Sequence, residues 1–118
     1  MSATQGPEQK AEGGTKFDAG KNRLDLLPFD ALGEVGLVLT FGANKYDDRN
    51  WEKGMSWGRC LGAGLRHVFA WARGERKDPE TGLNHLAHAI CCFLFLLAYD
   101  IRGAGTNDLS APVDDLFI

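Results

Sequence analysis

The sequence predicts an all-α fold, a small helical bundle with core helices at about 28–44, 56–73 and 81–102. Three segments carry apolar residues at intervals of three and four, which is the period of an amphipathic helix. No segment alternates polar and apolar residues as a half-buried strand does. With 118 residues, 44% of them hydrophobic and 25% charged, the chain has the size and composition of one globular domain.

The first helix is expected to begin at Pro28, because proline suits the opening turn of a helix. Its segment FDALGEVGLVLTFGANKY presents one apolar face for burial, and Gly42 is expected to close or distort the helix. That face consists of Leu32, Val35, Val38 and Leu39.

The second helix, SWGRCLGAGLRHVFAWAR, is expected to end at Gly74. Gly58 and Gly62 lie one turn apart and would let a neighbouring helix approach closely, at a cost of about 1 kcal/mol each in helix stability. The same glycines are equally consistent with a helix that begins late, near Cys60. The expected core positions are Leu61, Leu65, Val68 and Phe69.

The third helix is predicted to run from an N-cap at Thr81 to Arg102, and it contains the apolar run AICCFLFLLAY. Because this run is apolar on every side, the helix must be surrounded by its own domain or buried between subunits. A folded core limited to residues 17–102 is too small to surround it. The sequence therefore predicts a bundle that is completed by homo-oligomerisation.

The two ends of the chain lack helical periodicity. Residues 1–16 have no large hydrophobic side chain after Met1 and are expected to form a disordered leader, while residues 103–118 are expected to form a flexible acidic tail. The tail ends in VDDLFI, an acidic and apolar pattern typical of docking peptides, although an ordinary free terminus explains it better.

Composition also bounds the compartment and the partners. The start of the chain has no apolar signal sequence, and no apolar run approaches the ~20 residues that span a bilayer. Three cysteines, two of them adjacent, provide no disulfide framework, so reduced thiols and a cytoplasmic location are expected. A net charge of −3 argues against a general nucleic-acid binder. Neither a membrane nor a nucleic acid is therefore expected as a partner.

Positive charge is concentrated in the middle of the chain, where seven basic residues lie between Arg49 and Lys77 against only Glu52 and Glu75. This distribution suits a small polyanion such as a nucleotide, although a solvated helix face is the commoner origin of such a run. The segment FGANKYDDRNWEKG adds aromatic rings on which a base can stack, unless Trp51 is simply a core plug.

Two of the three histidines, His85 and His88, lie one turn apart on one face of the third helix, and Asp78 and Glu80 precede them. Neutral imidazole binds transition metals, and these acidic residues suit a cation. Hydrogen-bonded core histidines, and carboxylates that complement the helix dipole, would give the same pattern. Spacing alone leaves these alternatives open. His67 is expected to face the same bundle from the second helix.

Glu34 interrupts the apolar stretch LGEVGLVL of the first helix. A buried carboxylate without a partner is costly, so a buried Glu34 would need a metal, a histidine or an arginine beside it. A solvent-facing position on an amphipathic helix explains this residue equally well.

Four stretches of the chain, in order and without large gaps, resemble the dATP/dGTP diphosphohydrolase domain of phages and bacteria. They are KFDAGKNRLDLLP, FGANKYDDRNWEKG, LRHVFAWARGE and DPETGLNHLAHA, within residues 17–102. This family is similar to the MazG-like all-α nucleoside triphosphate pyrophosphohydrolases and includes the MazZ enzymes of some phages. The resemblance implies a helical oligomer that hydrolyses dGTP or dATP to the monophosphate and pyrophosphate with a divalent metal, Mn or Mg. Such an enzyme would serve phage nucleotide-pool metabolism in the host cytoplasm.

The metal ligands depart from the MazG-like pattern of one ExxE and one ExxD carboxylate pair. Glu34 matches the first glutamate, but Leu37 stands three residues later, and HLAH of the third helix takes the place of the second pair. Imidazoles in place of carboxylates indicate a softer metal than Mg²⁺. The candidate catalytic and metal-binding residues are Glu34, His67, Asp78, His85 and His88.

The resemblance also leads us to expect that basic residues neutralise the triphosphate and that loop residues contact the base or sugar. The candidates are Lys45, Lys53 and Arg66 for phosphate, and Asn50 and Trp51 for base or sugar. A non-catalytic nucleotide sensor or phage adaptor on the same bundle is an alternative, because the departures fall at the metal site. An HD-type nucleotidase is a weaker one, because no His-Asp dipeptide occurs in the chain.

Overall fold

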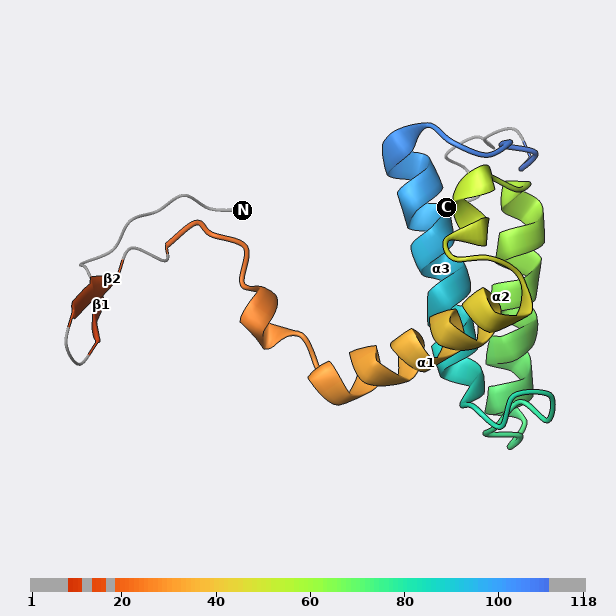
Figure 1. The fold of residues 1–118 in the computed structure, drawn as a ribbon, viewed down its shortest axis with the longest axis horizontal. Coiled ribbons are helices and arrows are strands. Elements are labelled where there is room, and N and C mark those ends of the chain that lie inside the picture. Colours follow the sequence, from red (N-terminus) through yellow and green to blue (C-terminus); the bar gives the residue numbers. More distant parts are fainter. Residues whose placement is uncertain (1–8, 12–13, 17–18, 111–118) are drawn as a thin grey trace, which may run out of the picture.

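The computed structural model describes residues 9–11, 14–16 and 19–110, and it confirms the all-α architecture (Figure 1). The helices are α1 (Phe29–Lys45), α2 (Trp57–Ala72) and α3 (His85–Arg102). Two short 3-10 turns, η1 (Leu24–Leu26) and η2 (Asn50–Lys53), precede α1 and α2. Strands β1 (Gln9–Ala11) and β2 (Gly14–Lys16) form a small antiparallel hairpin with Lys10 opposite Thr15. This hairpin lies within the predicted disordered leader and was not expected.

Helices α2 and α3 run antiparallel, side by side, and form the main contact of the fold (Figure 1). Gly64 of α2 is buried where this helix packs against Phe93 of α3. A Cβ atom at Gly64 would lie 2.5 Å from Cε1 of Phe93 on α3, so only glycine fits there without a shift. A glycine thus does allow close helix packing in α2, but at Gly64 and not at the predicted Gly58 and Gly62.

The chain after α3 fixes the beginning of α2. The Trp57 N–H donates to the Thr106 carbonyl at 2.9 Å, and the Trp57 indole N–H donates to the Ala104 carbonyl at 2.9 Å. The Gly58 N–H donates to Oδ1 of Asp108 at 2.8 Å. We call residues 103–108 the C-terminal clasp. Because of this clasp, α2 begins at Trp57 and not near Cys60. The clasp residues 103–108 belong to the segment that was predicted to be a flexible tail, but they contact α2. Residues 111–118, which include VDDLFI, lie outside the described residues.

Helix α3 begins at His85, four residues later than predicted. The Asn84 side chain, and not that of Thr81, caps the helix by accepting a hydrogen bond from the Leu86 N–H at 2.8 Å. The connection from α2 closes as a narrow loop, in which the His85 N–H donates to the Arg76 carbonyl at 2.8 Å. The predicted end of α3 at Arg102 is confirmed, and Gly103 follows with a left-handed φ of 66°.

Helix α1 ends at Lys45, so its predicted bounds of about 28–44 are confirmed to within one residue, but it runs through Gly42 and does not close there. From Val35 onward it packs on α3, whereas its first turns project away from the α2–α3 pair (Figure 1). Of its predicted buried face, only Val35 is buried, and Leu32 and Leu39 remain 40% and 39% exposed. A large part of the apolar surface of α1 is therefore uncovered in a single chain.

Helix α3 is also incompletely covered. Its buried side chains, among them Ala89, Cys91 and Tyr99, face α1 and α2. The opposite face presents an exposed apolar stripe, the α3 stripe, made of Ile90, Leu94, Leu97 and Ile101. By length and composition α3 alone among the described helices would suffice to cross a membrane, a test that core helices of soluble proteins also pass.

Candidate metal and nucleotide site

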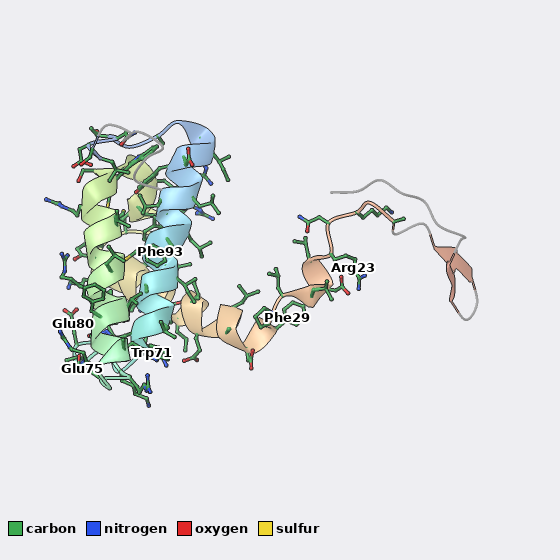
Figure 2. The ribbon with its side chains drawn as sticks, turned by 180° about the vertical axis from the view of Figure 1, so that it is seen from behind. Arg23, Phe29, Trp71, Glu75, Glu80 and Phe93 are labelled. Atoms are coloured by element: carbon green, nitrogen blue, oxygen red, sulfur yellow. The ribbon has the colours of Figure 1, made fainter. Side chains whose placement is uncertain are left out.

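All three histidines of the chain meet at the end of the α2–α3 pair that the loop 73–84 connects. The rings of His67 and His88 stack with centroids 4.7 Å apart and planes 12° apart. The ring of His85 lies tilted beside His67, with a centroid distance of 5.2 Å. Figure 2 shows Glu75 and Glu80 at this same end. The antiparallel pairing thus brings together residues that are 18 positions apart in the chain.

Three ligand-type atoms converge in this region. Nδ1 of His67 lies 2.9 Å from Nδ1 of His85. Oδ2 of Asp78 lies 3.8 Å from the first of these nitrogens and 4.0 Å from the second. We call these residues, His67, Asp78 and His85, the histidine–aspartate cluster. His85 is buried and the other two are half-buried, so two imidazoles and one carboxylate meet in a partly water-excluded place.

Two members of the cluster, His85 and Asp78, are oriented by a second contact. Nε2 of His85 faces Oε1 of Glu75 at 2.7 Å. The Asp78 side chain accepts, through Oδ1, hydrogen bonds from the backbone N–H groups of Glu80 at 2.7 Å and Thr81 at 3.3 Å. This local turn leaves Oδ2 of Asp78 free to face the two histidines.

His88 belongs to the same region but not to the cluster. Its Nε2 lies 2.7 Å from the Thr81 hydroxyl oxygen, which also accepts a hydrogen bond from the Leu83 N–H at 3.1 Å. The Thr81 hydroxyl is thereby placed to donate its proton to His88. Thr81 therefore orients His88 and does not act as the N-cap that the sequence predicted.

The surroundings favour neutral imidazoles. Burial lowers the pKa of His67, and the neighbouring His88 and His85 lower it further. Burial is also the main cause of the lowered pKa of His88. For Asp78, burial acts to raise the pKa, but the hydrogen bonds from the Glu80 and Thr81 N–H groups and the nearby histidines outweigh it, so this pKa is lowered. A neutral His67 ring and an ionised Asp78 carboxylate are the protonation states in which these two groups bind a metal.

The pKa directions predict that the metal-free protein loses stability on acidification. Because His67 and His88 have folded-state pKa values below the ordinary 6.5, the unfolded chain binds more protons below that pH. The free energy of unfolding should therefore decrease as the pH falls from about 7 through 6. Asp78 cannot cause this loss, because its lowered pKa gives a stabilising contribution that declines only as the pH falls to about 3.8 and below.

Urea unfolding in the presence of a chelator, at pH 7.5 and pH 5.5, measures this effect. The His88→Gln variant, which cannot gain a proton at that position, should show a weaker dependence on pH. An unfolding free energy that is the same at both pH values in the native sequence would contradict the prediction.

A cavity of about 640 Å³ adjoins the histidines. It lies between the C-terminal part of α1, the loop before α2 and the first half of α3, and His88 and Thr81 form the wall nearest to the cluster. Its volume is in the range of about 300–1,000 Å³ that is usual for small-molecule sites. Apolar and aromatic side chains dominate the lining, including Val38, Phe41, Met55 and Phe95.

Among the predicted phosphate-binding residues, only Lys45 lines this cavity. Its Nζ lies 3.1 Å from Oε2 of Glu80, which also lines the cavity. Lys53 is exposed and lies 3.3 Å from Asp47, and Arg66 is exposed beside His67 on α2. Glu34 is likewise exposed on α1 and is not part of the cluster.

Asn50 and Trp51, the predicted base or sugar contacts, both line the cavity. The Trp51 ring, however, is already stacked on Phe95, at a centroid distance of 4.9 Å and an angle of 11°. The Arg102 guanidinium lies 5.1 Å from the same ring, and the Tyr99 hydroxyl donates to the Trp51 carbonyl. Trp51 thus anchors the loop to α3. Tyr46 also lines the cavity; it is 61% exposed, and the Lys45 ammonium lies 5.5 Å from its ring centre.

Sequence reasoning missed Glu75 and Thr81 as partners of the histidines. Glu75 follows the helix-ending Gly74, and only the hairpin-like return of the loop, with Lys77 paired to Asn84, places it beside His85. No spacing rule along one helix indicates such a contact. Asp78 and Glu80, the acidic residues before α3, were the one feature of the sequence that indicated a functional role for this loop.

An all-α domain with a histidine–aspartate cluster beside an apolar cavity belongs to the class of small-molecule binding domains with a candidate metal site. The comparison with known families is specific. Residues 11–109 match the model of the N-terminal domain of dATP/dGTP diphosphohydrolases, and the chain belongs to this family.

One similar protein is the dATP/dGTP diphosphohydrolase of Salmonella phage PMBT28, which is 41% identical over 83 residues. The match covers 70% of this chain but only 28% of the phage protein, so the chain corresponds to a minor part of that relative's length. No solved structure matches the chain.

Proposed function

We propose that this chain hydrolyses a purine deoxynucleoside triphosphate, dGTP or dATP, to the monophosphate and pyrophosphate with the help of a divalent metal. The observation that carries the proposal is the position of His88, which lines the cavity and stacks on His67 of the cluster. A base in the apolar cavity would have its triphosphate directed toward two imidazoles and a carboxylate. The name of the phage relative supports this substrate class. The proposed setting is the phage nucleotide pool in the host cytoplasm.

In this proposal different residues of the chain bind the metal, the phosphates and the nucleoside. A divalent ion held by His67, Asp78 and His85 would neutralise phosphate charge and lower the pKa of a bound water. Lys45, at the cavity edge, would exchange its ion pair with Glu80 for a phosphate oxygen and so hold the triphosphate. Tyr46 and Asn50 would contact the base or sugar, while the apolar lining excludes water from the nucleoside.

We also propose that the active form is a homo-oligomer. The projecting part of α1 begins at Phe29, which is 69% exposed, and the α3 stripe extends to Ile101, which is 76% exposed. Apolar surface on this scale is typical of contacts between proteins, so we assign it to further copies of the chain and to neither a membrane nor a nucleic acid.

A second candidate function is nucleotide binding without turnover. The specific observation in its favour is that the chain corresponds to only 28% of the phage relative, whose remaining part can hold the residues for chemistry. As a sensor or adaptor, the chain would still use the cavity to bind the nucleoside triphosphate.

The test is a turnover assay with the purified chain. Each dNTP and NTP is incubated with Mn²⁺, Mg²⁺ or no metal, and pyrophosphate and orthophosphate are resolved as products. We expect metal-dependent pyrophosphate from dGTP or dATP, and a loss of at least about 100-fold in kcat/KM in His85→Ala. Arg59→Ala, which removes an exposed charge near the start of α2, serves as the matched surface control.

The outcomes separate the two candidates. Binding of dGTP or dATP without any product would replace hydrolysis by the sensor function. Orthophosphate as the primary product would exclude a diphosphohydrolase. The absence of both binding and turnover with every nucleotide would overturn both candidates.

A further inference from the structure

We propose that His67, Asp78 and His85 form a binding site selective for transition-metal ions of the Mn, Co and Zn class over Mg²⁺, and that Glu75 is the positioning residue that sets the tautomer of His85. The proposal deepens the proposed function, because it names the kind of ion that the site takes. It does not depend on turnover, however, since the site is complete in the chain without a nucleotide.

The argument begins with the ring nitrogens of His85. This side chain is only 4% exposed, so each of its nitrogens needs a partner. Its Nε2 lies 2.7 Å from a Glu75 carboxylate oxygen, which can only accept a hydrogen bond, so the proton of the neutral ring is on Nε2. Nδ1 is then left with a lone pair that points toward His67 and Asp78.

His67 presents the same kind of atom from the other helix. Its Nδ1 is 2.9 Å from Nδ1 of His85, and without a metal one proton between them must satisfy both nitrogens. Oδ2 of Asp78 adds a third acceptor, whose partner oxygen Oδ1 is already held by two backbone N–H groups. The place where these three atoms converge therefore holds more electron pairs than protons, as a cation site does.

The spacing fits a small ion. Bonds of about 2.0 to 2.2 Å place neighbouring ligand atoms about 3 to 3.5 Å apart. The two nitrogens already stand at 2.9 Å, and Oδ2 of Asp78, at 3.8 and 4.0 Å, would approach by roughly half an ångström on binding. A carboxylate on a loop accommodates such a shift more easily than a helix backbone does.

The donor set decides which ion is preferred. Imidazole nitrogen favours Mn, Co and Zn increasingly along the series, whereas Mg²⁺ demands oxygen ligands in a near-ideal octahedron. The cluster offers two nitrogens and one carboxylate oxygen. The other nearby carboxylates are already engaged, Glu75 with His85 and Glu80 with Lys45. The described residues therefore do not provide the oxygen-rich set of ligands that would make Mg²⁺ the preferred ion.

Glu75 lies outside the cluster and supports it by accepting a hydrogen bond from His85. A carboxylate that accepts the second N–H of a metal-binding histidine fixes its tautomer and ring orientation, and the loss of such a partner commonly costs about 10- to 100-fold in metal affinity. Glu75 reaches His85 from the first residue after Gly74, where α2 has ended. Its role is therefore to present His85 to the ion, not to touch the ion itself.

The experiment is a metal titration of the full chain after removal of metals with a chelator. Calorimetry with Mn²⁺, Zn²⁺ and Mg²⁺, and the visible spectrum of Co²⁺, are measured without nucleotide. We expect one Mn²⁺, Zn²⁺ or Co²⁺ per chain and at least a 100-fold weaker affinity for Mg²⁺. The Co²⁺ spectrum should lack the thiolate charge-transfer band, because the cluster offers two imidazoles and one carboxylate and no thiol.

Variants locate the site and test the part played by Glu75. His85→Ala should abolish binding, and Glu75→Ala should weaken it 10- to 100-fold, whereas Glu75→Gln, whose amide oxygen still accepts the hydrogen bond, should restore most of the affinity. Asp100→Ala removes an exposed carboxylate of α3 about 22 Å along the helix from His85 and is the matched control. Histidine ¹⁵N–¹H spectra of the metal-free protein should show His85 protonated at Nε2 in the native sequence and in Glu75→Gln, and a tautomer mixture in Glu75→Ala.

Each result bears on the proposal directly. Equal affinity for Mg²⁺ and Mn²⁺, or native affinity in His85→Ala with an unchanged circular dichroism spectrum, would overturn the site. Native affinity and tautomer in Glu75→Ala would overturn the role of Glu75. Selective binding without turnover leaves the inference standing and removes the proposed hydrolysis, while Mg²⁺-supported turnover without transition-metal binding does the reverse.

Discussion

Trp51→Ala is expected to lower the free energy of unfolding by about 3 kcal/mol, because this side chain holds the α1–α2 loop onto α3. Its ring is stacked on Phe95 and lies near Tyr99, at centroid distances of 4.9 and 6.1 Å. The Arg102 guanidinium approaches the same ring at 5.1 Å. Removing the ring leaves these three groups without their common partner and opens one wall of the cavity.

Trp51→Phe separates this structural role from a contact with the base. Phenylalanine keeps a ring to stack on Phe95, so the loss should fall to about 1 kcal/mol. Because the ring of Trp51 is already engaged, KM for the nucleotide should stay near its native value in this variant. Urea unfolding and steady-state kinetics measure the two quantities. A clearly raised KM with native stability in Trp51→Phe would instead identify Trp51 as a base contact.

Gly105→Ala is expected to cost about 3 kcal/mol by forcing the C-terminal clasp off the beginning of α2. Gly105 has a φ of 72°, a left-handed conformation that costs an L-residue about 1 to 2 kcal/mol. A Cβ atom there would also lie 2.7 Å from the Met55 carbonyl oxygen and 3.1 Å from the Trp57 indole nitrogen. A backbone carbonyl cannot rotate away as a side chain can, so the clasp itself must move.

Gly103→Ala is the matched control. Gly103 has a similar φ of 66°, but a Cβ atom there would meet nothing within 4 Å. Only the backbone cost of about 1 kcal/mol should appear in its thermal or urea unfolding. Equal losses in the two variants would show that the contact with Met55 and Trp57 contributes nothing.

The sequence was most informative where one local signal decides the structure. The helical periods of all three segments were confirmed, since a 3.6-residue apolar repeat is a property of each segment alone. Boundaries failed where a distant residue decides them. Asp108 and Thr106 determine the beginning of α2, although they lie about fifty residues further along the chain. Asn84 caps α3 in place of Thr81, and the pairing of Asn84 with Lys77 in the loop accompanies this later start.

The candidate site could be predicted only in part for the same reason. Helical spacing related His85 to His88, but the contact between His67 and His85 depends on the register of α2 against α3, which Gly64 and Phe93 determine. Glu34 was a reasonable candidate because it interrupts an apolar stretch. It is exposed in the structure although the neighbouring Val35 is buried, so Glu34 lies on the solvent-facing side of α1, and its position in an apolar stretch could not distinguish this from burial.

The arrangement of the clasp and the cluster predicts how amide hydrogens exchange with solvent along the chain. Helices α2 and α3 are tied together at one end by residues 103–108 and at the other by the loop that carries Asp78, so neither end is free to fray. Helix α1 packs on α3 from Val35 onward, while its first turns project into solvent. In dilute solution the slowest exchange should therefore lie in the middle of α2 and α3, and the fastest helical exchange at Phe29 to Leu32, where opening needs only a local fluctuation.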